Sequence, residues 1–474
     1  MELPLGFIMD FAYNPSGVSS DSIAQYLELF AGREFGSHHI KDIAAVLMEY
    51  SRLVARRRFE SITPTTYSYF DHHELENVLN EWVQLAQTTI DVANTLPEEY
   101  QSTFWHLAGY PVAAGANYHK TVLGQARNRV YAVQRRNMAN LVAKEVLQYF
   151  EDDFDLGEKY DTIANGKWKG MMSQPKFDSG VSTDFRQTSR DVLANLSFVQ
   201  LRQDSNYKLG PLGIYAEGND NLLLDGLLAA SIDPTAPTLG NWSPVVPQIT
   251  RYGPQFRTAE IYHRGDERVA INWTISNQYD WLQISHLSGQ ISSSVPQQVL
   301  YISVDWDRIP AGFNDTVSVT VTWDTPPYFD FLHIPVQNAE VPQDFHGFPE
   351  SGGLISIEAT HFQHQSATPN GTLGFTSIPF LGTRSNSGVI AIRPYAAARM
   401  SAAEACSAYV EYQIYLLEDS PAMNATLYIT AGLDTDPTLP MRYSLTLDNA
   451  IPNPVRLLEE PNQYEAENRV GFWL

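Results

Sequence analysis

The chain has 474 residues, of which 43% are hydrophobic and 18% are charged, and this composition excludes an intrinsically disordered polymer. Its 31 lysines and arginines stand against 54 aspartates and glutamates, and the net charge of −23 argues against nucleic acid or an anionic membrane surface as a partner. The single cysteine, Cys406, excludes an intrachain disulfide, and no apolar run reaches the ~18 residues of a membrane-spanning helix. A chain of this length has room for about three domains.

The first 19 residues do not resemble the usual start of a protein. The opening MELPLGFIMD lacks a basic segment, and Asp10 ends its apolar run too early for a secretory signal peptide. We therefore predict a buried β-strand at the start of residues 1–19, and no signal peptide.

Residues 20–180 carry helical patterns, in which apolar side chains recur every three or four residues. The stretches with this spacing are 40–47, 75–86, 97–136 and 138–150. Asp71 and Glu74 match a capping box ahead of the second stretch, and we expect Pro111 to kink or break the third. Four to six helices joined by short links predict a helical bundle.

From about residue 213 the helical spacing gives way to short β-rich runs between turn residues. These runs are 270–276, 299–305, 316–323, 354–358, 409–416 and 425–430. Their spacing favours antiparallel β-sandwiches. The predicted fold is a multidomain α plus β chain whose parts are 1–19, a bundle over 20–180, a connection over 181–212, a β-sandwich over 213–340 and a C-terminal β-sandwich over 341–474, with 338–350 as the link between the sandwiches.

Two pairs of adjacent histidines stand in the helical region: His38-His39 and His72-His73. Adjacent side chains on a helix point about 100° apart, so a metal site would need one histidine of each pair and a carboxylate such as Asp42 or Glu76. The alternative, which we favour, is that they are polar residues at helix starts. No metal site is therefore predicted.

Two clusters of like charge allow a binding or a structural interpretation. The acidic run 151–155 could bind Ca²⁺, but it lacks the spacing and glycine of an EF-hand loop, and a solvated helix end is favoured. The basic residues gather at Arg56, Arg57, Arg58, Arg127, Arg129, Arg135 and Arg136. They could clamp a carboxylate ligand, but ion pairing within the acidic bundle is the favoured interpretation.

No nucleophile elbow, phosphate-binding loop, dinucleotide fingerprint or zinc-protease helix occurs, and no cofactor is predicted. A glycosidase needs two carboxylates that converge in space, which spacing alone cannot identify. Asn-x-Ser/Thr sequons occur at Asn195, Asn241, Asn272, Asn314, Asn370 and Asn424. Their concentration in the β-rich half suits a glycosylated, secreted protein.

Longer words of the sequence carry a family resemblance. They are MELPLGFIMDFAYNP at 1–15, FAGREFG and EYSRLVARRRFE within 30–60, GKWKGMMSQPKF at 166–177, LGIYAEG at 212–218 and VPQDFHGFPESGGLISIEATHF at 341–362. Over about 1–455 the chain resembles the carboxyl-terminal half of glycoside hydrolase family 115, the xylan α-1,2-glucuronidases.

The resemblance implies that residues 1–15 are the last strand of a (β/α)₈ barrel and its exit loop. Full-length family members remove 4-O-methyl-glucuronic acid from glucuronoxylan with inversion, which needs a general acid and a general base with a water between them. The family's proposed catalytic carboxylates lie in the barrel, upstream of this chain, so no catalytic residue is expected here and the chain alone is expected to be inactive. Asn14, with Asp10 and Tyr13, matches the strand end that faces the substrate pocket. We predict that Asn14 contacts substrate; the alternative is an Asn-Pro turn residue.

The C-terminal region is similar to carbohydrate-binding modules of family 6. The first strand of those modules often holds a structural Ca²⁺ through Glu-Ala-Glu, but in 357–362 Thr360 replaces the second glutamate, which disfavours calcium. Aromatic side chains could stack on xylose, although Trp273 and Trp281 are expected in the core. Residues 462–474 match nothing that the family leads us to expect, so we predict an incomplete last sandwich.

Two functional hypotheses follow. In the first, the chain is a fragment of a hydrolase that is extracellular in its full-length form and acts on glucuronoxylan or xylo-oligosaccharide. In the second, it is a non-catalytic carbohydrate-binding or assembly protein. The resemblance also implies homodimerisation through the helical and C-terminal regions, with neither nucleic acid nor membrane as a partner.

Overall fold

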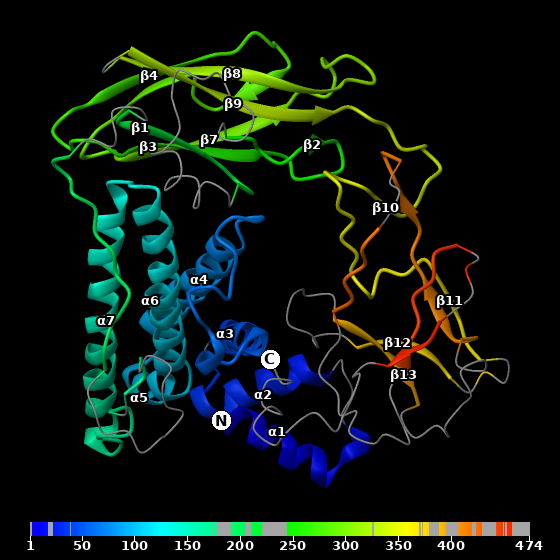
Figure 1. Cartoon of the computed structure of the whole chain (residues 1–474). Helices are drawn as coiled ribbons and strands as arrows, with labels where there is room; N and C mark the ends of the chain where they lie inside the picture. Colours follow the sequence, from blue (N-terminus) through cyan, green and yellow to red (C-terminus); the bar gives the residue numbers. More distant parts are fainter. Residues whose placement is uncertain are drawn as a thin grey trace. The chain divides into compact units, whose positions relative to one another are not determined.

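The computed structural model describes residues 2–17, 22–37, 39–173, 175–177, 191–203, 210–219, 244–324, 327–368, 371, 373–378, 388–394, 406–419, 423–428, 442–448, 450 and 453–456. The chain divides into two compact units. Unit 1 combines Met1–Ser51 with Ile62–Glu340, and unit 2 combines Arg52–Ser61 with Val341–Leu474. Helices come first and strands follow, as the sequence predicts (Figure 1). Most of the predicted connection 181–212 lies outside the described residues.

The first element is a helix where the sequence predicted the last strand of a barrel. α1 spans Glu2–Tyr13, and a 3-10 turn, η1 (Pro15–Gly17), follows it. The predicted strand is therefore wrong for this structure. A strand needs a neighbouring strand to satisfy its backbone N–H and C=O groups, whereas a helix satisfies them within itself. No strand in the described part of the chain pairs with α1, and its leucine, methionine and alanine residues favour a helix.

The other α-helices are α2 (Ser22–Phe35), α3 (Ile40–Arg56), α4 (Glu74–Thr95), α5 (Glu98–Phe104), α6 (Tyr110–Val133) and α7 (Met138–Thr162), and 3-10 turns lie at η2 (Phe59–Ser61) and η4 (Ile163–Gly166). α6 and α7 run side by side (Figure 1) and approach closely at Gly124. A Cβ atom at Gly124 would lie 2.4 Å from Val146 Cγ2, so a larger residue there would force the two helices apart. None of the helices within the described ranges is long and apolar enough to cross a membrane.

The long predicted helix over 97–136 is interrupted next to Pro111, as expected. Between α5 and α6 the chain forms a single π-helical turn, η3 (Trp105–Gly109), and Pro111 occupies the first turn of α6. Proline has no backbone N–H, so it cannot donate the bond that the preceding turn of a regular α-helix requires. The wider π turn changes the hydrogen-bond register at this point.

The strands of unit 1 are β1 (Leu212–Ala216), β2 (Ile249–Thr250), β3 (Arg257–His263), β4 (Ile271–Ser276), β5 (Leu282–Ile284), β6 (Ser288–Ile291), β7 (Gln297–Val304), β8 (Asn314–Asp324) and β9 (Pro327–Gln337). They form two sheets with the orders β1-β3-β7-β5 and β2-β9-β8-β4-β6. Neighbouring strands are antiparallel except β2 and β9. The four-stranded sheet lies nearer the helices, and the five-stranded sheet covers its other face (Figure 1).

One hydrophobic core fills the space between these two sheets. Along β4 buried and exposed residues alternate, with Ile271, Trp273 and Ile275 inside. Trp273 lies opposite Trp323 of β8, and Trp281 is 5% exposed in the same core. Both tryptophans that we expected in the core are therefore confirmed there.

The segment 191–203 fastens the helices to the sheets. Asn128 of α6 binds the backbone of Ser197 with both its amide groups, at 2.8 and 2.9 Å. Asn140 of α7 does the same at Val199, at 2.7 and 3.0 Å. Each asparagine thus replaces the partner that a neighbouring strand would supply to an extended backbone.

Unit 2 contains short strands that pair two by two in its described residues. The strands are β10 (Phe348–Pro349), β11 (His364–Ser366), β12 (Gly374–Ile378), β13 (Val389–Arg393), β14 (Tyr409–Glu411), β15 (Ile414–Tyr415), β16 (Arg442–Tyr443) and β17 (Val455–Arg456). The pairs are β10–β15, β11–β14, β12–β13 and β16–β17. The predicted strand at 354–358 is wrong, because only Leu354 forms a bridge there, with Ser351. Residues 462–474 lie outside the described residues.

Candidate functional site

Asn14, the predicted substrate contact, follows the last turn of α1. Its backbone N–H donates to the carbonyl of Asp10 at 3.0 Å, and its side-chain Oδ1 accepts from Ser16 Oγ at 3.2 Å. Asn14 and Asp10 are exposed, and Tyr13 is 93% exposed. These contacts are those of a turn residue, and a role of Asn14 in substrate binding stays a prediction.

The histidine pairs do not converge on one metal site in the described residues. His39 lies beside Asp42, with Nδ1 3.2 Å from Oδ2, at the surface. His72 is exposed, whereas Nε2 of His73 lies 3.0 Å from Glu217. No group of three histidine, cysteine, aspartate or glutamate side chains within the described ranges is arranged to hold a metal, and His38 lies outside those ranges.

The segment 357–362, for which the sequence analysis disfavoured calcium, is held by hydrogen bonds of its backbone carbonyls. The backbone carbonyl of Glu358 accepts from the N–H of His361, and that of Ala359 accepts from Tyr412 Oη at 2.7 Å. The first is the bond of a turn, and the second joins the segment to Tyr412. Among the residues that the structure describes, this segment also lacks a group of three side chains that could hold a metal.

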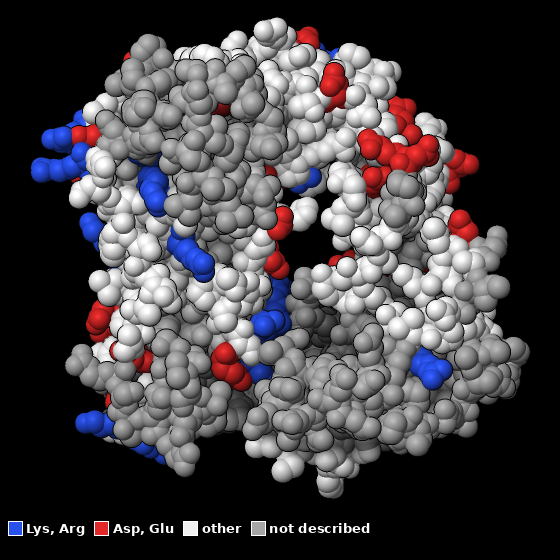
Figure 2. Space-filling view, viewed as in Figure 1, with Lys and Arg blue, Asp and Glu red and all other residues white. Residues whose placement is uncertain are grey.

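The arginines of 127–136 differ in exposure and in their partners. Arg127 lies 3.9 Å from Glu76, which is the predicted ion pairing within the bundle. Arg129 and Arg135 are exposed, and Arg136 is fully buried. On the face shown in Figure 2 basic side chains are separated by acidic and neutral ones. The arginines of 127–136 thus do not form one clamp.

Arg136 is the centre of a buried cluster at the junction between the helices and the four-stranded sheet. Its Cζ lies 4.2 Å from the ring centre of Tyr262, 4.4 Å from that of Tyr131 and 5.3 Å from that of Tyr215. Its Nη1 donates to Glu260 of β3. Burial acts to lower the pKa of Arg136, but Glu260 and the neighbouring tyrosines outweigh it and raise the pKa. The guanidinium is therefore permanently charged, and its Nε and Nη1 atoms donate to Gln134 and Glu260.

A second ion network lies beside it, around Glu217 at the end of β1. Oε1 of Glu217 accepts from Arg257 Nη1 at 2.9 Å, and Oε2 accepts from the backbone and hydroxyl of Thr258 at 2.7 and 2.9 Å. His73, in the loop before α4, completes the network on Oε2. Burial raises the pKa of Glu217, but these hydrogen bonds and the Arg257 charge outweigh it and hold the pKa at about 2. Glu217 is thus a permanent carboxylate that links α4 to the sheet.

The sequence analysis missed Glu217, Arg257 and Glu260. The sequence did contain a sign of these ion pairs. Arg257 and Glu260 are charged residues within β3, whose other residues are buried. A charge inside such a strand needs a partner. Its identity was not predictable, because the partner of Glu260 is Arg136, which lies 124 positions away in the sequence.

The family-like word at 166–177 packs onto the π turn before α6. Trp168 stacks on His106 with 5.3 Å between ring centres, and His106 Nδ1 lies 2.6 Å from Tyr160 Oη. Lys159 Nζ lies 3.5 Å above the ring centre of Trp105. π turns are frequent at functional sites. Here Trp168 covers the ring of His106 and Lys159 covers the ring of Trp105, which indicates a packing role for this turn.

Lys176, in the same segment 166–177, pairs with one residue of the acidic run 151–155. The prediction of a solvated helix end at 151–155 is wrong, because α7 continues to Thr162 and Asp153 is buried. Oδ2 of Asp153 accepts from Lys176 Nζ at 2.7 Å. The run faces solvent on one side of the helix and supplies one buried ion pair on the other.

Lys176→Met is expected to lower the free energy of unfolding of unit 1 by about 2 kcal/mol, because it leaves the Asp153 carboxylate without its partner. The exposed Lys169→Met is the matched control and should change stability by less than about 0.5 kcal/mol. Chemical denaturation at neutral pH measures both. Equal effects of the two substitutions would contradict the assignment of a buried ion pair.

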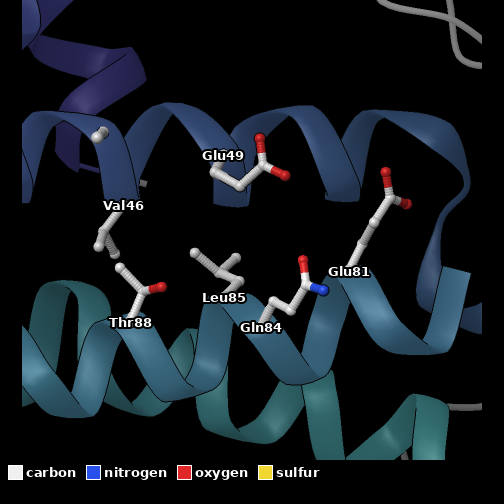
Figure 3. A pocket seen from close by; sticks show the side chains of 7 residues that line it. Val46, Glu49, Glu81, Gln84, Leu85 and Thr88 are labelled. Carbon is white, nitrogen blue, oxygen red and sulfur yellow. The ribbon is translucent and has the colours of Figure 1, made fainter. Parts of the chain in front are cut away.

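A pocket of about 260 Å³ lies between α3 and α4 (Figure 3). Its lining residues are Ala45, Val46, Glu49, Glu81, Gln84, Leu85 and Thr88. Val46 and Leu85 are buried and form an apolar floor. The pocket is smaller than the usual range of ligand sites, about 300–1,000 Å³.

Four of the six sequon asparagines lie in the described residues. Asn195, Asn272, Asn314 and Asn424 are all exposed. Asn272 and Asn314 lie on β4 and β8 of the five-stranded sheet. Asn241 and Asn370 lie outside the described residues.

Comparisons with known proteins identify the family. A family model described as glycosyl hydrolase family 115 matches residues 1–61, and one described as the glycosyl hydrolase family 115 C-terminal domain matches residues 347–473. The search of curated proteins finds no match. A solved family 115 4-O-methyl-α-glucuronidase with specificity for decorated arabinogalactans is similar at 16% identity and a TM-score of 0.33, over 64% of this chain and 42% of that chain. The periplasmic chaperone SfaE follows at 11% identity and a TM-score of 0.18, over 21% of this chain and 59% of that chain.

The two family models match opposite ends of the chain, and the words quoted above lie in and between them. The C-terminal model extends to residue 473, so the expectation that residues 462–474 match nothing in the family is wrong. The chain spans less than half of the length of the solved glucuronidase. The sequence words and the two family models agree, and residues 1–61 and 347–473 of this chain match glycoside hydrolase family 115.

Proposed function

We propose that this chain corresponds to the carboxyl-terminal part of an α-glucuronidase that removes 4-O-methyl-glucuronic acid from glucuronoxylan with inversion. The observation that carries the proposal is the pair of family models, of which the hydrolase model covers residues 1–61 and the C-terminal domain model covers 347–473. A solved family 115 protein to which this chain is similar is a 4-O-methyl-α-glucuronidase. In this proposal the sheets of 213–340 and the unit that follows are the β-sandwich parts of that enzyme.

The chain alone is proposed to lack activity. An inverting glycosidase needs a carboxylic acid and a carboxylate about 6.5–9.5 Å apart, with room for sugar and water between them. The buried carboxylates of Asp153 and Glu217 are held by Lys176 and Arg257 instead. The low pKa of Glu217, about 2, is the opposite of what a general acid requires.

The purified chain is expected to release no glucuronic acid from 4-O-methyl-glucuronoxylan, since the resemblance places the acid and the base in the barrel domain of the family. Release is measured by chromatography of the soluble products. A cooperative thermal transition of the same sample shows that the protein is folded. Release above that of a heat-inactivated sample would contradict the proposal of inactivity.

A chimera tests the family role separately. The carboxyl-terminal part of an active family 115 glucuronidase is replaced by this chain, and the chimera is expected to keep glucuronidase activity. Assays on glucuronoxylan and on a decorated arabinogalactan compare the proposed substrate with that of the solved glucuronidase. Because the barrel of the chimera comes from the host enzyme, only a shift of preference toward arabinogalactan relative to that host would contradict glucuronoxylan as the substrate.

The second candidate function is carbohydrate binding without catalysis, and a row of aromatic rings on β9, formed by Phe329, Phe331 and His333, favours it. Phe329 in this row is 64% exposed. Retention of the chain on insoluble xylan supports this candidate. We also propose an extracellular location, supported by the exposed sequons, and a homodimer, which size-exclusion chromatography with light scattering tests.

A further inference from the structure

The outer face of the five-stranded sheet presents a row of aromatic rings. Leu332, Ile334 and Val336 of β9 point into the core, so the alternate residues point away from it. The outward residues include Phe329, Phe331 and His333. Ring centres are 5.6 Å apart for the first pair and 6.3 Å apart for the second. In Figure 1 this sheet is the layer of unit 1 farther from the helices.

A ladder of hydroxyl groups runs beside the rings on β8. The register places Thr322 opposite Phe329, Thr320 opposite Phe331 and Ser318 opposite His333. Ser318 Oγ lies 2.6 Å from His333 Nδ1, and Thr322 Oγ1 lies 2.7 Å from the hydroxyl of Thr274 on β4. The face therefore combines a row of apolar rings with oriented donors and acceptors along one edge.

This face carries little charge, although the protein is strongly acidic. The sequences of β4, β8 and β9 contain no lysine or arginine. Of their outward residues Asp324 is an acid, and its carboxylate accepts from the Asn272 amide at 2.7 Å. An anionic ligand would find no cation on these strands. Charge and shape thus select a neutral partner with an apolar face and a polar rim.

We propose that the row Phe329, Phe331 and His333, with the hydroxyls of β8, binds a neutral polysaccharide, namely an unsubstituted stretch of xylan backbone. The C–H faces of pyranose rings pack on aromatic side chains, and their ring hydroxyls exchange hydrogen bonds with the threonines. Phe329 is the main stacking residue, because its ring is the most exposed of the row and is turned 74° from that of Phe331. The choice of xylan rests on the proposed function.

Calorimetric titration of the full chain with xylohexaose tests the proposal. Phe329→Ala is expected to weaken binding about tenfold, and Thr322→Val, which keeps the shape and removes the hydroxyl, about threefold. Tyr301→Ala is the matched control. Tyr301 is 49% exposed and pairs with Phe256, but it lies on β7 in the other sheet, so its loss should leave the affinity unchanged.

An unchanged affinity of Phe329→Ala, an equal loss in Tyr301→Ala, or no binding of any neutral hexasaccharide by the unmodified chain would each overturn the proposal. Binding of polygalacturonate through the same residues would overturn the charge argument. Binding of cellohexaose in place of xylohexaose, lost in Phe329→Ala, would support the site and count against xylan. The binding experiment does not depend on glucuronidase activity. A negative result would therefore not affect the proposed glucuronidase role, which the chimera tests separately.

Discussion

Arg136→Met is expected to lower the free energy of unfolding of unit 1 by about 4 kcal/mol, the largest effect of any substitution considered for this chain. Arg136 is 0% exposed and joins the turn between α6 and α7 to β3 through Glu260. Methionine fills much of the same volume, so the loss arises from charge and hydrogen bonding more than from a cavity.

The size of the effect follows from what the substitution leaves behind. Glu260 would keep its charge in a partly buried position, where an uncompensated carboxylate costs several kcal/mol. The rings of Tyr131 and Tyr262 would also lose the cation that lies over them. The Gln134 side chain would lose its bond to Arg136 Nε, which has a length of 2.6 Å.

Chemical denaturation at neutral pH measures this effect, with Arg129→Met as control. Arg129 is exposed near the end of α6, and its substitution should change stability by less than about 0.5 kcal/mol. The double variant Arg136→Met with Glu260→Leu should recover much of the loss, because it removes both charges. A double variant that is as unstable as the sum of the two single ones would rule out coupling between Arg136 and Glu260.

Local patterns predicted the elements that depend on nearby residues. The spacing of apolar residues alone predicted the buried face of α4, and Leu75, Val78 and Trp82 are buried on it. The run 316–323 falls inside β8, since alternation with period two marks a sheet that is buried on one side. The same reasoning found the interruption near Pro111.

Other features depended on partners that no local pattern reveals. The capping box of Asp71 and Glu74 is wrong, since α4 begins at Glu74 and its carboxylate instead accepts from the N–H of Ser68. α7 runs twelve residues past its predicted end at 150, because Lys176 neutralises Asp153 in the acidic run. The ion networks of the junction join α4, α6 and β3 over long separations, so their residue types were visible and their pairing was not.

The stability of unit 1 is expected to depend on pH through Glu217 and His73, with a maximum between about pH 4.5 and 6.5. The pKa of Glu217 falls from 4.5 to about 2 in the folded chain. Its contribution, about 3 kcal/mol, is therefore fully present above pH 4.5 and is lost as the pH falls toward 2. The hydrogen bond to Glu217 raises the pKa of His73 above 6.5, so the contribution of His73 is present below that value and is lost as the pH rises.

Substitutions of Glu217 and His73 separate the acidic limb from the alkaline limb of the dependence of stability on pH. Glu217→Gln should destabilise unit 1 by about 3 kcal/mol at pH 7 and by little at pH 2, because the carboxylate is then protonated in the unmodified chain as well. His73→Gln should destabilise at pH 5.5 and much less at pH 9, where the imidazole is neutral. The charges that act on His73 besides Glu217 are Glu76 and Glu260, and both strengthen its protonated form.

His72→Gln is a closely matched control for the His73 variant. The two residues are adjacent, and their backbones have the same left-handed conformation, with φ of 51° and 53°. Strain from the substitution is therefore alike in both, and only His73 reaches Glu217. Thermal unfolding from pH 2 to 9 should show a flattened alkaline limb in His73→Gln and an unchanged one in His72→Gln. Identical profiles would mean that the left-handed loop, and not the ion pair with Glu217, sets the pH dependence.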